Sequence, residues 1–527
     1  MFAESMRKCS ALFRLFFLNY FVFLLNPAFA QEPKKIELLN ADVSEFDQSI
    51  NAKATRLLGN VAFKHENAIM HCDSAYLYQD ENRLEAFQNI RITQGDTLTL
   101  TGKRLLYDGN TRQAQVFENV VLSDQRMTLR TSRLDYDLGT DIAFYKDSAN
   151  IVDGENTLTS RLGYYYSNTH DMYFREDVLL VNPKYRMEGD TLRYNTLDKS
   201  AYFLGPTWLH SANNVIYCES GWYNTINQTS SFHKNSYLQT ETQLLRGDSV
   251  LYDRNSGIGR VFGNVSIEDT TNKIIIGGDY GEHHEVSDSS WVTGHALMSQ
   301  IFTTDTLFLH ADTLLAVGEK IKGDTAASKR NMFAFHDVRL FKSDFQGSCD
   351  SLVYNFKDST IRMFYEPVLW SGLNQLTADS VTLQTANSEI THIHLVNNSF
   401  ITSRADSVSL EIPDSLKFNQ IRGKRMTGFF EKNELVRIDV KGNGQTIYYA
   451  KNNRQQNFAV NRADCSDMII FVDKSKVKTI TLQNDPDGTM YPIHELSTTE
   501  LRLKGFSWLE NKRPKSKADL FSAADRK

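Results

Sequence analysis

The chain has 527 residues, of which 41% are hydrophobic, 23 are Tyr and 32 are Phe, and only 9 are Pro. This is the composition of an ordered protein without long linkers. The formal net charge of -6 is small for this length, and the chain has no basic block and no long acidic tail. We therefore expect no nucleic-acid partner.

The first 30 residues have the features of a secretory signal peptide. Arg7, Lys8 and Arg14 precede an apolar run at 15–25, and Ala28-Phe29-Ala30 fits the small-x-small rule for cleavage. Cleavage after Ala30 gives an exported mature chain. The alternative is an uncleaved anchor, but the apolar run is short for a membrane span. No later segment has the length and apolarity of a span, so we expect no transmembrane helix in the mature chain.

A first landmark recurs along most of the chain. It consists of a small residue, a polar residue that is often Asp, then Ser, Thr or Arg, an apolar residue, and usually a Tyr two places on. Gly247-Asp248-Ser249-Val250-Leu251-Tyr252 is a complete copy, and other copies begin at Gly102, Thr131, Thr159 and Cys349. Such self-similarity at a fixed period indicates a repeat architecture.

A second landmark alternates with the first. It consists of an aromatic or apolar residue, Gly or a charged residue, Asn or Asp, and then Val or Ile, as in Phe262-Gly263-Asn264-Val265. The central positions are 60, 89, 119, 148, 177, 206, 235, 264 and 295, with steps of 29 to 31 residues. A step of 42 residues to Asp337 marks an insertion at 318–330. Chance does not produce this register.

The segments between landmarks alternate apolar and polar residues, as in Val61-Ala62-Phe63-Lys64-His65. This period of two, with many Val, Ile, Tyr, Phe and Thr residues, predicts strands with two distinct faces. Each repeat is then two long or four short strands, and stacking about twelve repeats buries an interior that none could bury alone. We predict an all-β array at 31–406, divergent β repeats at 407–485 and an irregular C-terminal tail at 486–527.

Four cysteines remain in the mature chain: Cys72, Cys218, Cys349 and Cys465. An even number in an exported chain normally suggests disulfides. However, the first three occupy the small-residue position of the first landmark, where Cys acts as a small apolar residue. With strands roughly 4.8 Å apart, Cys72 and Cys218 lie roughly 50 Å from each other, too far for a bridge. We predict buried free thiols.

No motif in the chain carries enzyme chemistry. His283, His284 and His295 do not have the spacing of a known zinc site, and surface histidines at a turn are the simpler interpretation. The repeated Asp of the first landmark could form stacked calcium sites, but a backbone-bonding role at a bend is favoured, since Lys103 and Ser132 replace it. We predict no catalytic residue, no cofactor and no metal.

The two landmarks, alternating about every 29 residues in an exported all-β chain, resemble those of the organic-solvent-tolerance (OstA/LptA) family. The resemblance covers about 36–406 and extends more loosely to about 485. It implies an elongated, V-shaped or half-open β-jellyroll in the periplasm, whose apolar trough carries lipopolysaccharide or a related acylated glycolipid towards the outer membrane. Unpaired strand edges at both ends favour head-to-tail pairing with other β-jellyroll transport proteins.

Strand parity identifies candidate residues for the lining of the trough. Most belong to one face, and Leu192, Tyr194, Val250 and Tyr252 could form a facing wall. The full set is Val61, Phe63, Ile90, Ile92, Val120, Leu122, Val178, Leu180, Leu192, Tyr194, Trp208, Val250, Tyr252, Val265 and Ile267. Trp208 is expected to share the face of Leu192 and Tyr194.

Other interpretations of the same pattern remain open. The apolar residues could fill a closed core without forming a trough. The array could be a cell-surface solenoid for adhesion or glycan binding, which an exposed aromatic ladder would favour. It could also be a solenoid glycan hydrolase or lyase, which a cluster of three carboxylates on one face would favour.

Overall fold

The computed structural model describes residues 34–46, 53–95, 98–212, 214–240, 243–271, 273–319, 329–386, 389–405, 417–451, 457–473, 476–492 and 495–521. The predicted signal peptide and most of the insertion at 318–330 lie outside these residues. The chain forms two compact units, Met1–Met172 and Tyr173–Lys527, called here the N-terminal and the C-terminal unit.

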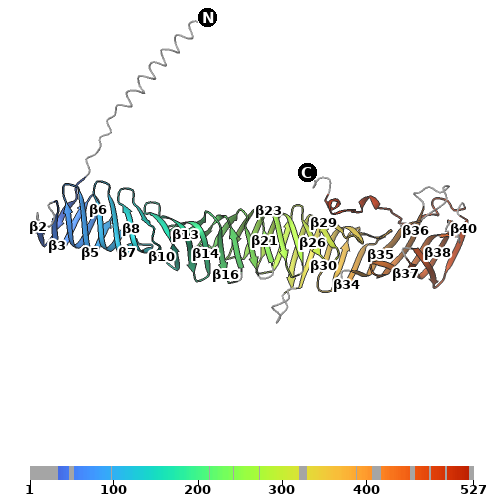
Figure 1. Ribbon diagram of the computed structural model, residues 1–527. Helices are drawn as coiled ribbons and strands as arrows, with labels where there is room; N and C mark the ends of the chain where they lie inside the picture. Colours follow the sequence, from blue (N-terminus) through green and yellow to red (C-terminus); the bar gives the residue numbers. More distant parts are fainter. Residues whose placement is uncertain are drawn as a thin grey trace, which may run out of the picture. The chain divides into compact units, whose positions relative to one another are not determined.

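The predicted all-β class is confirmed in both units (Figure 1). Within the described residues, the regular elements are strands, apart from two short 3-10 helices, η2 (Glu510–Lys512) and η3 (Lys517–Leu520). None of the helices in this part of the chain is long and apolar enough to cross a membrane.

The N-terminal unit contains long antiparallel strands followed by shorter ones. They are β1 (Glu37–Asn40), β2 (Val43–Glu45), β3 (Thr55–His65), β4 (Ala68–Tyr78), β5 (Arg83–Gln94), β6 (Leu98–Asp108), β7 (Gln113–Ser123), β8 (Thr128–Asp137), β9 (Ile142–Tyr145), β10 (Ala149–Asp153), β11 (Asn156–Ser160) and β12 (Leu162–Tyr166). β13 (Asp171–Asn182) begins at the division between the units.

The C-terminal unit mixes short and long strands, and the longest lie near its end. They are β14 (Tyr185–Asn195), β15 (Ser200–Phe203), β16 (Thr207–Ser211), β17 (Asn214–Cys218), β18 (Ser220–Asn224), β19 (Thr229–His233), β20 (Tyr237–Thr240), β21 (Gln243–Arg246), β22 (Ser249–Asp253), β23 (Ile258–Asp269), β24 (Ile274–His284), β25 (Ser289–Thr293), β26 (Leu297–Ile301), β27 (Thr306–His310), β28 (Thr313–Glu319), β29 (Lys329–Phe341), β30 (Phe345–Asn355), β31 (Thr360–Phe364), β32 (Val368–Ser371), β33 (Asn374–Thr377), β34 (Ser380–Ala386), β35 (Glu389–Arg404), β36 (Phe418–Glu431), β37 (Glu434–Lys451), β38 (Asn457–Asp473), β39 (Lys476–Gln483) and β40 (Asp487–Pro492).

The second landmark is the place where a long strand bends. In β5, Gln88 and Asn89 both have positive φ, at 60° and 47°, and the register with β6 shifts between Phe87 and Ile90. Asn tolerates this left-handed conformation better than most residues. The bend divides each long strand into two halves, so the sheet forms two walls. We call the wall that contains Phe63 the first wall and the wall that contains Leu105 the second wall.

The apolar alternation forms continuous rows along both walls. In the N-terminal unit, the register aligns a first-wall row: Phe63, Met70, Ile92, Leu100, Leu122, Leu129, Ile151 and Leu158. A second-wall row consists of Leu57, Ala75, Ala86, Leu105, Val116 and Leu134. The members of both rows are buried, at 3% exposure or less. The rows face a common interior, because the Tyr107 hydroxyl of the second wall lies 2.6 Å from His65 Nδ1 of the first.

The C-terminal unit repeats this plan. Its first-wall row runs through Met187, Leu209, Ile216, Leu238, Leu245, Ile267, Ile276, Met298, Leu309, Leu340, Gly347, Leu369, Leu376, Ile401 and Ile421. Its second-wall row includes Leu192, Phe203, Phe232, Val250, Val261, Val292, Leu314, Leu352, Met363, Val381, Leu395, Met426, Val440 and Met468. Each long strand contributes one half to each wall. Elsewhere a pair of short strands takes the place of one long strand, which agrees with the predicted repeat of two long or four short strands.

The small-residue position of the first landmark lies at the same bend. A Cβ atom on Gly102 would meet Val116 Cγ1 at 2.4 Å, and one on Gly247 would meet Val261 Cγ1 at 2.3 Å. A valine from the second wall occupies the space there, which explains why Gly, Ala or Cys fills the position in most repeats. The four described cysteines are free and buried, which confirms the prediction of unbridged thiols.

Candidate functional site

The two walls meet again at the edge opposite the bend, which we call the mouth. In the N-terminal unit, tyrosine hydroxyls of the second wall cross the mouth to side chains of the first wall. Tyr136 Oη donates to Gln94 Oε1 at 2.8 Å, and Tyr165 Oη donates to Asp124 Oδ2 at 2.5 Å. An ion pair from Arg112 to Glu66 at 2.9 Å adds a further contact. Polar bonds therefore close the mouth of this unit.

These tyrosines are held in the form that can donate. Burial raises the pKa of Tyr107 and of Tyr136 well above the ordinary value. Burial also raises the pKa of Tyr165, and its hydrogen bond to the Asp124 carboxylate adds to the effect. A phenol is thus present at every physiological pH, so each of these hydroxyl groups keeps its proton.

The tyrosines belong to one row on the second wall, in which large and small residues alternate. Tyr107, Ala114, Tyr136, Ala143 and Tyr165 are neighbours through the strand register. The corresponding row of the C-terminal unit includes Tyr194, Ala201, Tyr223, Ser230, Tyr252 and Gly259. Tyr354 is its last tyrosine, and it donates across the mouth to Gln300 Oε1 at 2.9 Å. Small neighbours leave room for the rings from Tyr107 to Tyr165 and from Tyr194 to Tyr252, whereas Tyr354 lies between Met332 and Ile361.

Beyond Tyr354 the row becomes aliphatic. Its members are Ile361, Leu383, Ile393, Gly428, Ile438, Ile470 and Ile480. None of these side chains can donate a hydrogen bond across the mouth. The tyrosine closure therefore ends before the last repeats, in the region where β35, β37 and β38 reach 16, 18 and 17 residues.

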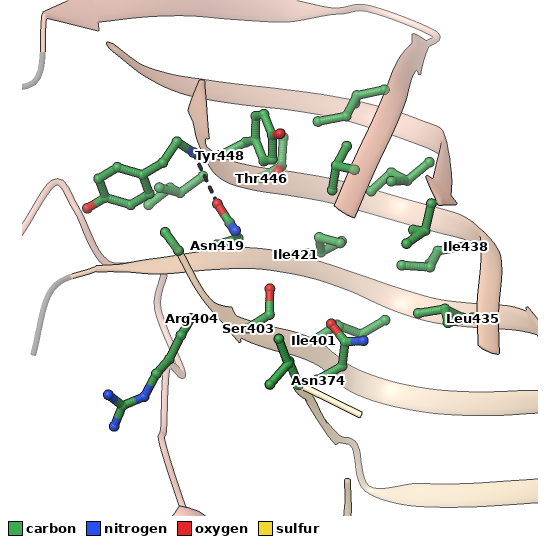
Figure 2. A pocket seen from close by; sticks show the side chains of 18 of the residues that line it. Asn374, Ile401, Ser403, Arg404, Asn419, Ile421, Leu435, Ile438, Thr446 and Tyr448 are labelled. Atoms are coloured by element: carbon green, nitrogen blue, oxygen red, sulfur yellow. Dashed lines mark hydrogen bonds between the residues drawn. The ribbon is translucent and has the colours of Figure 1, made fainter. Parts of the chain in front are cut away.

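A cavity of about 410 Å³ lies at this aliphatic end (Figure 2). Ile401 and Ile421 line it from the first wall, and Leu435, Ile438 and Ile470 line it from the second. Apolar side chains of both walls thus contribute to its lining. We take this cavity as the candidate site.

The lining of the cavity also contains polar side chains. Asn374, Ser403, Asn419, Thr446 and Tyr448 are uncharged, and Arg404 and Lys451 are basic. Arg404 points away from the cavity in Figure 2, and its guanidinium lies 5.7 Å from the centre of the Trp508 ring. The site therefore combines aliphatic side chains with polar and basic ones, which suits an acyl chain with a polar head. Its volume falls within the ~300–1,000 Å³ range of small-ligand sites.

Fourteen of the fifteen residues predicted to line a trough point to the interior, with 8% exposure or less. They are Val61, Phe63, Ile90, Ile92, Val120, Leu122, Val178, Leu180, Leu192, Tyr194, Val250, Tyr252, Val265 and Ile267. The register places Leu192, Tyr194, Val250 and Tyr252 on the second wall. These fourteen residues lie along the packed interior, outside the 410 Å³ cavity.

Trp208 does not point to the interior, so the prediction that it shares the face of Leu192 and Tyr194 is wrong. Its side chain is 40% exposed and lies on the outer face, 5.1 Å from the ring of Tyr217, while Thr207 and Leu209 on either side are buried. The reason is that Trp208 belongs to β16 of the first wall, whereas Leu192 and Tyr194 belong to β14 in the second-wall register. Parity does not carry across the intervening turn at Gly205-Pro206.

The cavity residues were missed by sequence reasoning. They lie on β33 and β35 to β39, of which β36 to β39 fall in the segment predicted as divergent repeats. One signal could have found them: the tyrosine expected once per repeat is absent after Tyr354, and Leu383, Ile393 and Ile438 take its row position.

The histidines considered for metal binding have separate partners. His284 Nε2 lies 2.7 Å from Glu282, His295 Nδ1 lies 2.6 Å from Asp279, and His283 Nδ1 lies 2.8 Å from Ser290 Oγ. Across the described ranges, no group of three His, Cys, Asp or Glu side chains could hold a metal ion. In the repeat at Asp248, the landmark carboxylate accepts hydrogen bonds from Asn264 Nδ2 at 3.1 and 3.0 Å, so it bonds a side chain at the bend and not the backbone as predicted.

The fold defines a class of protein in which bent antiparallel strands stack into two walls around an apolar interior. Residues 33–190 match the sequence profile of the family described as OstA-like protein, and this confirms the resemblance over that stretch. A search of curated proteins found no match to the chain.

Proposed function

We propose that the protein is a non-enzymatic periplasmic lipid bridge. It binds the acyl chains of lipopolysaccharide, or of a related acylated glycolipid, between its two walls and passes the lipid towards the outer membrane. The observation that carries the proposal is the change of the mouth row from tyrosine to isoleucine beside an apolar cavity. Each methylene group buried there stabilises the complex by about 0.8 kcal/mol.

The arrangement also suggests where loading takes place. Where tyrosines cross the mouth, a lipid can enter only if hydrogen bonds such as Tyr136 to Gln94 break. At the aliphatic end no such bond has to break. We therefore assign acyl-chain entry to the repeats around Ile438, and expect the packed interior of the earlier repeats to open only during transfer.

The edges of the structure fit assembly with similar proteins. Among the described strands, β39 and β40 pair with β38 alone, and β1 and β2 pair with β3 alone. Their outer backbone groups can accept a further strand. Head-to-tail pairing with other β-jellyroll transport proteins would extend the interior into a continuous path.

A photo-crosslinking experiment tests the proposal. p-Benzoylphenylalanine in place of Tyr448, which lines the cavity, should crosslink to lipopolysaccharide in cells. The same group in place of Tyr202, which lies on the outer face beside Arg193, is the control. Depletion of the protein should also leave lipopolysaccharide inside the cell envelope. Equal crosslinking at both positions, or normal surface lipopolysaccharide after depletion, contradicts the proposal.

A second candidate function has one observation in its favour. Trp208, Tyr217 and Tyr237 form an outer-face aromatic ladder, with ring centres 5.1 and 5.3 Å apart. Exposed aromatic rings favour a cell-surface glycan-binding protein. The rings stack largely on one another, which leaves few ring faces for sugars, so this function ranks second. Retention on immobilised polysaccharide that is lost in Trp208→Ala would support it.

A further inference from the structure

The C-terminal tail, residues 495–521, returns along the C-terminal unit after β40 (Figure 1). Successive residues of the tail contact progressively earlier strands of the unit. Leu501 O meets Gln420, Ser507 O meets Gln375, and Leu520 O meets Arg339. The residues that it meets lie on the first wall, on the face that points away from the interior. The tail is therefore an external strap across several repeats.

Two buried glutamines hold the strap with the same geometry. Gln420 Nε2 donates to Leu501 O at 2.9 Å, and Gln420 Oε1 accepts from Leu503 N at 2.9 Å. Gln375 repeats this with Ser507 O at 2.9 Å and Leu509 N at 2.6 Å. Each side-chain amide thus satisfies the carbonyl of one tail residue and the N–H group two residues later, as a neighbouring strand would. Both glutamines are 1% exposed.

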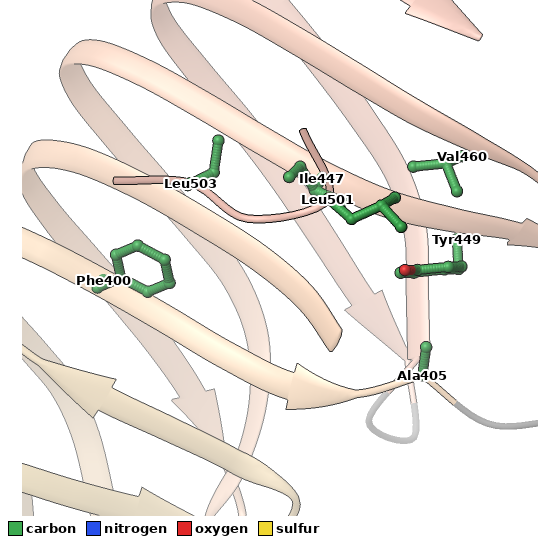
Figure 3. Packing of buried hydrophobic residues seen from close by; sticks show 7 residues of the cluster. All are labelled: Phe400, Ala405, Ile447, Tyr449, Val460, Leu501 and Leu503. Carbon is green, nitrogen blue, oxygen red and sulfur yellow. The ribbon is translucent and has the colours of Figure 1, made fainter. Parts of the chain in front are cut away.

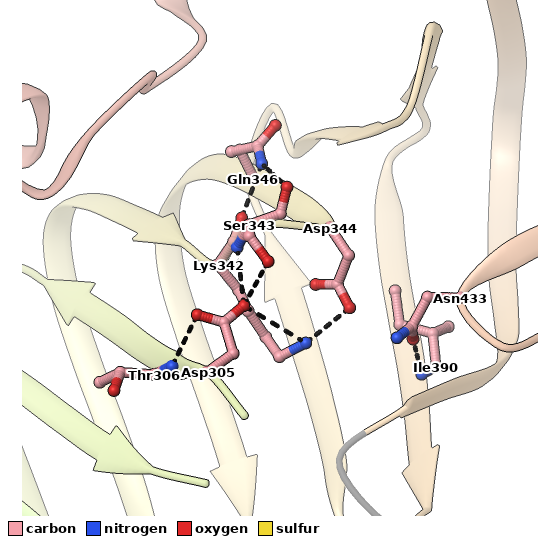
Figure 4. A network of polar contacts seen from close by, with 8 residues as sticks. All are labelled: Asp305, Thr306, Lys342, Ser343, Asp344, Gln346, Ile390 and Asn433. Atoms are coloured by element: carbon pink, nitrogen blue, oxygen red, sulfur yellow. Dashed lines mark hydrogen bonds and ion pairs between the residues drawn. The ribbon is translucent and has the colours of Figure 1, made fainter. Parts of the chain in front are cut away.

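A third glutamine extends the series. Arg513 Nε donates to Gln346 Oε1 at 2.8 Å. Figure 4 shows the other bond of this glutamine, in which Gln346 Nε2 donates to Lys342 O at 2.7 Å. Lys342 is itself buried and lies 2.5 Å from Asp344. The strap is thus anchored on polar side chains at three successive places.

Apolar contacts seal the strap between these anchors. Leu501 and Leu503 are 3% and 4% exposed and pack with Phe400, Ile447 and Tyr449 (Figure 3). Farther along, the Trp508 ring lies 4.9 Å from that of Phe418. Without the tail, this patch of the outer face would be exposed apolar surface.

The strap and the cavity share the same strands. On β36, Gln420 holds the tail and the next residue, Ile421, lines the cavity. On β35, Phe400 contacts the tail cluster and Ile401 lines the cavity. Neighbouring residues of a strand point to opposite faces, so this part of the first wall is a single layer between strap and cavity. Gln239, on the same face of the first wall but off the strap's path, is exposed.

We propose that the tail is a latch that limits the cavity to its present size and must release before a lipid with several acyl chains can enter. This rests on the proposed function. With the tail docked, the cavity of about 410 Å³ lies near the lower end of ligand sites, and several acyl chains need the walls to separate. Movement of the first wall shifts Ile421 and Gln420 together, so binding of a bulky lipid and docking of the tail oppose each other.

The test compares the mature protein with the double variant Gln375→Leu/Gln420→Leu, which keeps side-chain volume but removes both clamps. Gln239→Leu is the matched control. Crosslinking from p-benzoylphenylalanine in place of Tyr448 measures capture of two probes, lipid A in mixed micelles and palmitate. Hydrogen exchange at the Leu503 and Leu509 amides measures docking of the tail. If the double variant does not fold, Trp508→Ala replaces it, because this change loosens the tail without altering the wall.

Lipid A should speed exchange at Leu503 and Leu509 in the unaltered protein, and palmitate should not. The double variant should capture lipid A at about tenfold lower concentration, within the usual range of coupling between sites. Its capture of palmitate should match that of Gln239→Leu. If lipid A is captured equally by all proteins and does not change hydrogen exchange at Leu503 and Leu509, the proposal that the tail is a latch is wrong. The proposed function stands in that case. If neither probe reaches the cavity in any protein, the proposed function is wrong and the latch falls with it.

Discussion

Asn264 Nδ2 lies 3.1 and 3.0 Å from the two carboxylate oxygens of Asp248 and donates to them. Asp248 N in turn donates to Phe262 O at 3.0 Å and Gly263 O at 2.9 Å. The same pairing joins Asn89 to Asp73 at 2.8 Å. The two sequence landmarks are therefore the two sides of one bend, and each repeat fixes the next through it.

Substitution of Asn264 should separate two contributions of this bend to stability, namely the side-chain hydrogen bonds and the left-handed backbone conformation. Asn264 has a φ of 47°. Asn264→Ala loses the hydrogen bonds and strains the backbone, so the free energy of unfolding should fall by about 2 kcal/mol. Asn264→Gly keeps the conformation and should cost about half as much. Chemical denaturation of both variants checks this, and equal losses would contradict the role of the left-handed backbone.

Removal of one hydroxyl should loosen the closed mouth. Tyr136→Phe leaves Gln94 Oε1 without its donor and should destabilise the N-terminal unit by about 1 kcal/mol. Hydrogen exchange in β5 and β8 should rise. Tyr202→Phe on the outer face keeps its ring over Arg193 and should change little. Similar effects of the two variants would mean that the cross-mouth bond contributes nothing.

Filling the cavity should block lipid capture without unfolding the protein. Ile438→Phe puts a larger side chain into the 410 Å³ space, so crosslinking of lipid A at the cavity should fall at least about tenfold, while stability holds or rises. Ile275→Phe, the same change on the outer face of the first wall, is the control. Unchanged capture in Ile438→Phe would place the lipid elsewhere.

The four described cysteines should be unreactive in the folded protein. Burial raises the pKa of the Cys72, Cys218 and Cys349 thiols to about 12, so almost no thiolate exists at neutral pH. A thiol reagent should therefore label them only in denaturant, where all four described cysteines should react. Fewer reactive thiols after denaturation without reductant would reveal a disulfide.

Alkaline pH should destabilise the fold. Burial raises the pKa of Tyr354 and Tyr449 from 10.0 to about 12, and the buried thiols start from 9.0. Above about pH 9 the unfolded chain loses protons that the folded chain keeps, so stability falls as pH rises. Thermal unfolding followed against pH checks this. Tyr354→Phe should show a smaller alkaline loss, and a stability that is flat up to about pH 11 would contradict the expectation.

The sequence by itself determined the repeat, the all-β class, the bend and the unbridged cysteines. These features are local. The paired Asn264 and Asp248 are only 16 residues apart in the sequence. The period of two can likewise be seen within a single strand. The resemblance rested on the same local signals, and the match over residues 33–190 agrees with it.

Only the tertiary structure decided which face of each wall is inside, where the mouth closes and what covers the outer face. Parity does not carry across turns such as the one at Gly205-Pro206, which is why Trp208 lies outside. The change of the mouth row to isoleucine and the bonds of Gln420 to a tail residue 83 positions away depend on contacts between distant segments. No local pattern encodes such contacts, because any buried glutamine or isoleucine fits the same alternation.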